Sequence, residues 1–143
     1  MCGKLWGKVV TVMLALLIIM PVCAMTGCSG SKELDNKTSV DYTVVENADL
    51  PEELRKLIES KKDKVMRLTY TTKDYTYVVA GYGTRETSGY SIKVNDVYTG
   101  DNALYIDLNL IGPAAGEAVN EVETYPVIVL KMERREESVV FKM

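Results

Sequence analysis

From Val65 to the end of the chain, apolar and polar residues alternate with a period of two. This period is typical of strands that bury one face and expose the other to water. The clearest run is 103–111, in which every even position is leucine or isoleucine. The predicted strands are 65–72, 75–82, 90–98, 103–111, 124–132 and 138–142, and an earlier β-branched and aromatic run at 40–45 predicts one more.

Most connections between these strands are short. Lys73-Asp74 has the length of a hairpin turn, and Gly100-Asp101-Asn102 consists of residues that tolerate positive φ. Consecutive strands are therefore expected to pair antiparallel. We expect an α+β, mainly β fold, either an antiparallel meander or a small sandwich of about six to seven strands, with one amphipathic helix packed on it.

The helix is predicted from a single apolar stripe. Its members fall at i, i+4, i+7 and i+8: Leu50, Leu54, Leu57 and Ile58. Asp49 is the expected N-cap, Glu52 completes a capping box and Pro51 lies in the first turn. A helix lying on a membrane surface is an alternative. We favour a helix that covers a sheet, because glutamates lie among the lysines of its polar face.

The first 28 residues have the order of an export signal. Lys4 and Lys8 form a positive segment, and residues 9–20 are an uncharged stretch of twelve residues, which is short for a bilayer span. Met25-Thr26-Gly27-Cys28 then resembles the lipobox of bacterial lipoprotein precursors, with Met25 where that motif prefers leucine. The resemblance implies that the Cys28 thiol receives a diacylglycerol and that the chain is cut just before it.

We therefore predict a lipoprotein signal peptide at 1–27, a flexible tether at 28–39 and a single β-rich domain at 40–143. The expected location is the extracytoplasmic face of the cell membrane, where the lipid on Cys28 holds the protein. Two alternatives stay open. Val22-Cys23-Ala24 has the small residues of an ordinary secretory cleavage site, and the leader can instead remain as an uncleaved anchor.

Composition excludes several function classes. The chain has no histidine, so Ser-His-Asp and Cys-His catalysis and histidine-dependent zinc sites are absent. Its three cysteines, at 2, 23 and 28, leave no thiol inside the domain. Removing residues 1–27 takes away two lysines and changes the formal charge from −3 to −5. Nucleic acid is therefore an unsuitable partner, and we expect no metal or other cofactor.

One stretch, residues 81–94 with the sequence GYGTRETSGYSIKV, resembles the central motif of the PrcB C-terminal domain family. The matching positions are Gly83, Thr87, Gly89, Tyr90 and Ile92, and a second block matches at Tyr125-Pro126-Val127-Ile128-Val129. Ser88 stands where glycine is common in that family. The resemblance covers about residues 78–132.

That family is named after a lipoprotein subunit of a surface protease complex. The resemblance implies a small non-catalytic module that works outside the membrane through contact with another protein. The candidate binding loop consists of Gly83, Thr87, Ser88, Gly89 and Tyr90. Its glycines permit positive φ and close approach of another chain, and its hydroxyls can bond neighbouring backbone. A turn that only sets hairpin register is the alternative.

Other residue patterns carry weaker hypotheses. Ser91 and Lys93 share a strand face, as a Ser-Lys dyad requires, but nothing in the sequence supplies an oxyanion hole. The nine tyrosines suit either cross-strand packing, which we favour, or an exposed aromatic patch. We expect a lipid-anchored module, not an enzyme, that binds or stabilises an extracytoplasmic protein such as a secreted protease. The alternative is a lipoprotein that binds cell wall or glycan without catalysis.

Overall fold

The computed structural model describes residues 36–143. The predicted signal peptide, Cys28 and most of the predicted tether lie outside the described residues. The elements in chain order are β1 (Thr38–Ser39), β2 (Thr43–Val44), η1 (Asn47–Asp49), α2 (Glu52–Glu59), β3 (Val65–Thr71), β4 (Tyr75–Tyr82), β5 (Ser91–Gly100), β6 (Ala103–Ile111), β7 (Val127–Glu133) and β8 (Ser138–Lys142). None of the helices in this part of the chain has the length and apolar character needed to cross a membrane.

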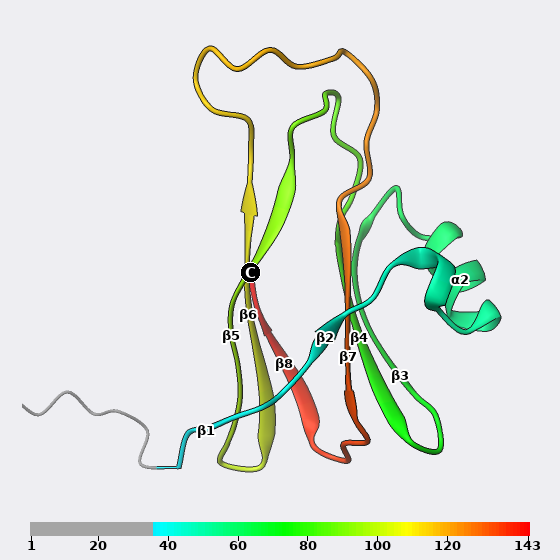
Figure 1. The fold of residues 1–143 in the computed structure, drawn as a ribbon, viewed down its shortest axis with the longest axis vertical. Helices are drawn as coiled ribbons and strands as arrows, with labels where there is room; N and C mark the ends of the chain where they lie inside the picture. Colours follow the sequence, from blue (N-terminus) through cyan, green and yellow to red (C-terminus); the bar gives the residue numbers. More distant parts are fainter. Residues whose placement is uncertain (1–35) are drawn as a thin grey trace, which may run out of the picture. The chain divides into compact units, whose positions relative to one another are not determined.

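The strands form two four-stranded sheets that face each other (Figure 1). Sheet A has the order β1-β5-β6-β8, and sheet B has the order β2-β7-β4-β3. Neighbouring strands pair antiparallel except β6 and β8, which are parallel. The predicted fold class is confirmed, in its sandwich form.

The two short strands correct the prediction of one strand at 40–45. The chain leaves sheet A after Ser39 and joins sheet B at Thr43, so it crosses from one sheet to the other. Val40 lies at the crossing, is 4% exposed and donates its N–H to the carbonyl of Val97 over 3.0 Å. The predicted single strand is therefore wrong, because alternation within a segment does not reveal which sheet each residue joins.

Sheet B is covered on both faces. One face packs against sheet A through the first core cluster, which includes Val78, Ala80 and Leu130. The other face packs against α2 through a second cluster, which includes Leu54 and Val79. Figure 1 shows α2 beside β3 and β4, away from the strands of sheet A. Full burial of a side chain such as Leu54, which is 0% exposed, contributes about 1.5–3 kcal/mol.

The helix begins two residues later than the capping box predicts. Pro51 is the N-cap and makes no side-chain capping bond, while Asp49 ends the short 3₁₀ turn η1. A proline disfavours helical geometry in the residue before it, and Leu50 is extended with φ −83° and ψ 149°. The predicted capping box is therefore wrong, although the predicted apolar stripe does face the sheet through Leu54 and Ile58.

Candidate functional site

Two loops meet at one end of the sandwich (Figure 1). We call residues 83–90 the motif loop and residues 112–126 the long loop. Arg85 and Thr124 join them as an isolated antiparallel bridge, with N–H to carbonyl distances of 2.8 and 2.9 Å. The motif loop is thus bound next to Tyr125-Pro126, the second block of the family resemblance. The two segments lie some forty residues apart in the sequence.

Two hydroxyls take part in this attachment, that of Ser88 in the motif loop and that of Thr124 in the long loop. The Ser88 N–H donates to the carbonyl of Asn120 over 3.0 Å, and the Asn120 N–H donates to Ser88 Oγ over 2.9 Å. The Thr124 hydroxyl donates to the carbonyl of Thr87 over 2.8 Å. These bonds support the turn interpretation of the motif, because they use groups that a binding loop would present to a partner.

The two glycines of the predicted loop are required by geometry. Gly83 has φ +73°, and a Cβ there would lie 3.2 Å from the carbonyl oxygen of Asp63. Gly89 has φ +90°, and a Cβ there would lie 3.0 Å from Cβ of Pro113. Tyr90 follows and packs its ring beside the Arg85 guanidinium, 5.6 Å from the ring centre. The structure therefore brings all the predicted loop residues together, and partner binding by them stays a prediction.

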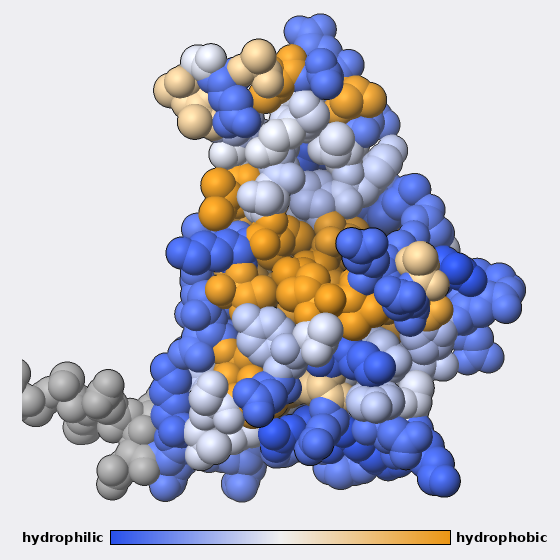
Figure 2. Space-filling model, viewed as in Figure 1, coloured by the Kyte–Doolittle hydropathy of each residue, from blue (hydrophilic) through white to orange (hydrophobic). Residues whose placement is uncertain are grey.

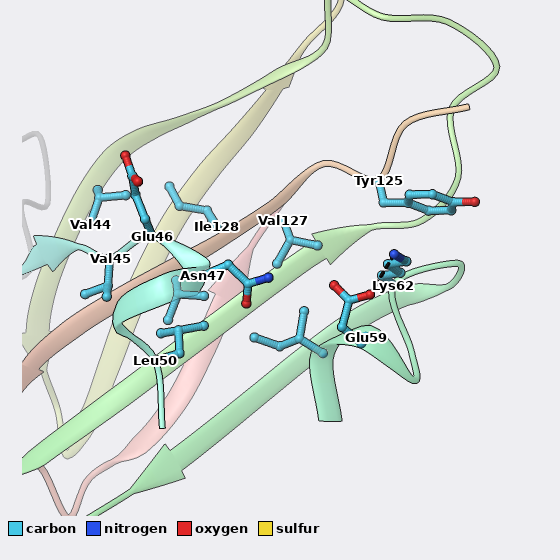
Figure 3. Close-up of a pocket in the computed structure, with 12 residues that line it drawn as sticks. Val44, Val45, Glu46, Asn47, Leu50, Glu59, Lys62, Tyr125, Val127 and Ile128 are labelled. Atoms are coloured by element: carbon cyan, nitrogen blue, oxygen red, sulfur yellow. Dashed lines mark hydrogen bonds and ion pairs between the residues drawn. The ribbon is translucent and has the colours of Figure 1, made fainter. Parts of the chain in front are cut away.

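A hollow of about 440 Å³ lies where η1 and the end of α2 approach the start of β7 (Figure 3). Its apolar lining consists of Val44, Val45, Leu50, Ile58, Val127, Ile128 and Val129. At its edge the Lys62 ammonium donates to Glu59 over 2.7 Å and lies 4.9 Å from the Tyr125 ring centre. The hydrogen bond to Glu59 raises the pKa of Lys62 above its ordinary value. These two charges therefore neutralise each other at the rim.

A second hollow, of about 260 Å³, is lined by residues of β2, of the start of β5 and of the start of β7. It shares Val44, Val127 and Ile128 with the first hollow and adds Ile92 from β5. We call these four residues the apolar groove. Figure 2 shows an apolar area over the middle of this face, where Figure 1 places β2 and the start of β7.

Sequence reasoning missed the apolar groove. Its residues alternate with polar neighbours as core residues of strands do, and nothing in that pattern marks them as exposed. In the structure the side chain of Val44 is 55% exposed, and Ile92 and Val127 are half-buried. The groove appears only when β2, β5 and β7 are brought together.

Several tyrosines pack across strands, as favoured from the sequence. Tyr98 and Tyr105 are paired across β5 and β6 and stack with ring centres 5.0 Å apart, and Tyr70 and Tyr77 are paired across β3 and β4 at 6.3 Å. The Lys142 ammonium donates to the Tyr98 hydroxyl over 2.6 Å, and this bond raises the pKa of Lys142. These rings stabilise the sheets and are not arranged as one exposed platform.

The remaining candidate chemistry is not assembled. Ser91 and Lys93 are both exposed on β5, and neither is joined to the other by a hydrogen bond. Among residues 36–143, no three side chains of the metal-ligating types gather into a site. What the structure does assemble is an apolar surface beside two joined loops, and such a surface suits contact with another molecule.

Comparison with protein families matches residues 76–133 to the family described as PrcB C-terminal. This match confirms the resemblance carried by the motif loop and the Tyr125-Pro126 block. No curated protein and no solved structure matches the chain. The matched segment runs from β4 into β7 and contains both loops, Ile92, Val127 and Ile128. Over residues 76–133, which build the centre of the sandwich and most of the apolar groove, the chain is similar to the PrcB C-terminal family.

Proposed function

We propose that this protein is a lipid-anchored extracytoplasmic module that binds or stabilises a partner protein. The observation that carries the proposal is the position of the PrcB C-terminal match, which contributes three of the four residues of the exposed apolar groove. The partner class that the family suggests is a secreted protease or another surface complex.

The proposed role is non-catalytic. The chain has no histidine, and its cysteines stand at 2, 23 and 28, so the usual nucleophile–base pairs cannot form within the domain. The candidate dyad of Ser91 and Lys93 lies on an exposed strand face without a hydrogen bond between the two side chains. Binding and stabilisation of a partner require no such machinery.

The proposed anchor is the lipid on Cys28. The nine residues between Cys28 and β1 then join the domain to the membrane surface, where it meets exported proteins. Metabolic labelling with a fatty-acid analogue tests the anchor. We expect the full chain to take up label and the Cys28→Ala variant to take up none, and equal labelling of the two would contradict lipidation.

Glycan binding has less support. It would need several tyrosine faces exposed on one side, whereas the tyrosines more than a third exposed are Tyr42 and Tyr75. The Lys131 ammonium lies 3.9 Å from the ring centre of Tyr75 and covers one face of it. We therefore do not advance it as a second function.

The experiment for partner binding uses the full chain with an affinity tag after Met143, expressed in the native host. Membranes are treated with a cleavable crosslinker before solubilisation, and the tagged protein is purified. We expect the same second protein in every repeat at a constant ratio, and its loss when crosslinking is done after the domain is released by proteolysis of the tether. Repeated recovery of the chain alone would contradict the proposal.

A further inference from the structure

Both sheets present an edge on the same side of the sandwich. On that side the edge strand of sheet A is β1, which pairs with β5. The edge strand of sheet B is β2, which pairs with β7. The two outer strands are only two residues long, whereas β5 and β7 span Ser91–Gly100 and Val127–Glu133. Each outer strand therefore covers only part of its neighbour.

The segment from β1 to β2 closes one half of this side. It pairs with β5 at Thr99 and Tyr98 and with β7 at Lys131 and Leu130, and Val40 is inserted between the sheets. We call this region the closed half. It shows what this side of the sandwich accepts, namely an extended chain with an apolar side chain pointing inward.

The other half lacks such a covering strand. Residues 91–94 and Asp96 of β5 pair with β6 on one side, with an irregularity at Asn95, and no strand of residues 36–143 pairs with residues 91–96 on the other side. The same holds for Val127 and Ile128 of β7, because β2 ends at Val44 and the chain turns into η1. We call this region the open half. An unpaired edge exposes backbone N–H and C=O groups that a further strand can bond.

The open half is apolar as well as unpaired. Ile92 and Val94 are half-buried and pack on the core, and Val44, Val127 and Ile128 line the hollows beside them. A strand added to β5 would send alternate side chains toward this surface. Apolar residues at those positions would repeat what Val40 does in the closed half.

A free carboxylate lies at the mouth of the apolar groove. Glu46, which lines the first hollow, is exposed and forms no ion pair and no side-chain hydrogen bond. Figure 3 shows the Glu46 carboxylate beside Val44 at the mouth of the groove. Lys62, at the edge of the same hollow, is already bonded to Glu59. The charge that complements the Glu46 carboxylate is positive.

We propose that the partner docks by strand addition in the open half. Its docking element is an extended segment that pairs with β5 over residues 91–96, places alternate apolar side chains in the apolar groove and ends in a lysine or arginine near Glu46. This inference rests on the proposed function, and it names the site and the binding mode. Strand addition draws its affinity from backbone bonds and its specificity from the pockets for alternate side chains.

The test places a photo-crosslinking amino acid in the full chain in its native host, at one position per variant. The groove position is Val44, and its matched control is Val65, another exposed valine on an edge strand of sheet B (55% and 63% exposed). A third variant carries the probe at Asn109, exposed on β6 of sheet A. Crosslinked peptides are sequenced by mass spectrometry.

We expect a crosslink from Val44 to a segment of a second protein that has alternating apolar residues and a nearby lysine or arginine, with at least about tenfold less from Val65. Crosslinks to another protein from Val65 or Asn109 but not from Val44 would overturn the docking mode and leave the proposed function standing. A crosslink from Val44 to a second copy of this chain would also overturn it. Absence of crosslinks at all three positions would overturn both proposals.

A synthetic peptide of the crosslinked segment then tests strand addition with the purified domain. We expect the backbone amides in residues 91–96 that do not already bond β6 to exchange hydrogen about tenfold more slowly when the peptide is bound. A peptide with proline at its centre is the control, because proline cannot complete the ladder. Glu46→Gln should weaken binding by about threefold. Unchanged exchange in β5 would contradict the pairing.

Discussion

The closed half and the open half of the sandwich differ in what covers the same two sheets. In the closed half the chain covers itself, and Val40 is 4% exposed. In the open half no described strand covers β5, and Val44 is 55% exposed at its border. Both regions have apolar walls, so their difference lies in where the chain goes after Val44 and not in composition.

Because of this difference, side chains in the closed half should contribute to stability, and side chains at the border of the open half should contribute to binding. Side chains in the closed half bury apolar area within the folded chain and are expected to contribute to the free energy of unfolding. Side chains at the border of the open half bury little in the isolated domain, so their contribution is expected to appear when a partner is present. Substitutions in the two halves should therefore change different measurements.

The largest effect on stability is expected at Val40. Val40→Asp buries an unpaired charge between the sheets and should lower the free energy of unfolding by more than about 3 kcal/mol, whereas Val40→Ala should cost about 2 kcal/mol. Val44→Ala, the matched change in the exposed valine, should cost less than about 0.5 kcal/mol. Urea unfolding measures all three, and equal losses at Val40 and Val44 would remove the distinction between the halves.

A smaller effect is expected in the motif loop, which borders the open half. Gly83→Ala puts a Cβ at φ +73° within 3.2–3.3 Å of the backbone of residues 63–65, and the free energy of unfolding should fall by about 2 kcal/mol. Gly116 is the control. It has φ +84° but nothing within 4 Å of the added Cβ, so Gly116→Ala should cost only about 1 kcal/mol. A larger loss of unfolding free energy for Gly116→Ala than for Gly83→Ala would contradict close packing around Gly83.

The smallest effect on stability concerns Lys142, which contacts the strand that β1 covers. Its hydrogen bond to Tyr98 raises the pKa of Lys142 above the ordinary value of 10.5. The stability from this bond is thus fully present below pH 10.5 and is lost as the pH rises through the raised pKa. Lys142→Met should lose less stability than the wild type as the pH rises above 10.5. Parallel unfolding profiles for the two proteins would show that the bond contributes nothing.

Strand positions were predictable where alternation is strong and turn residues bound it. The strands at 75–82, 103–111 and 138–142 have the predicted bounds, and the turn at Asp101 and Asn102 has the expected positive φ of 42° and 74°. Which strands pair with each other was harder to predict. The parallel pairing of β6 with β8, and the pairing of β4 with β7, which are separated by both loops and by β5 and β6, depend on packing between distant segments.

The candidate site was also predicted only in part from the sequence. The motif loop was found because its glycines and hydroxyls form a local pattern that resembles a family. The apolar groove was not found, since Val44 and Val127 have the pattern of ordinary strand residues. Their exposure depends on β2 ending after two residues, and that depends on the turn of the chain into η1 before Pro51. No local pattern encodes that combination.

The most direct test of the account compares Val44→Asp with Val65→Asp in the full chain. Both place a charge on an exposed valine of a sheet B edge strand, so both should change the free energy of unfolding by less than about 0.5 kcal/mol. The measurement is the amount of partner recovered with each tagged variant from crosslinked membranes. The account predicts about a tenfold loss for Val44→Asp and no change for Val65→Asp. Equal recovery with the two variants would contradict the assignment of binding to the open half.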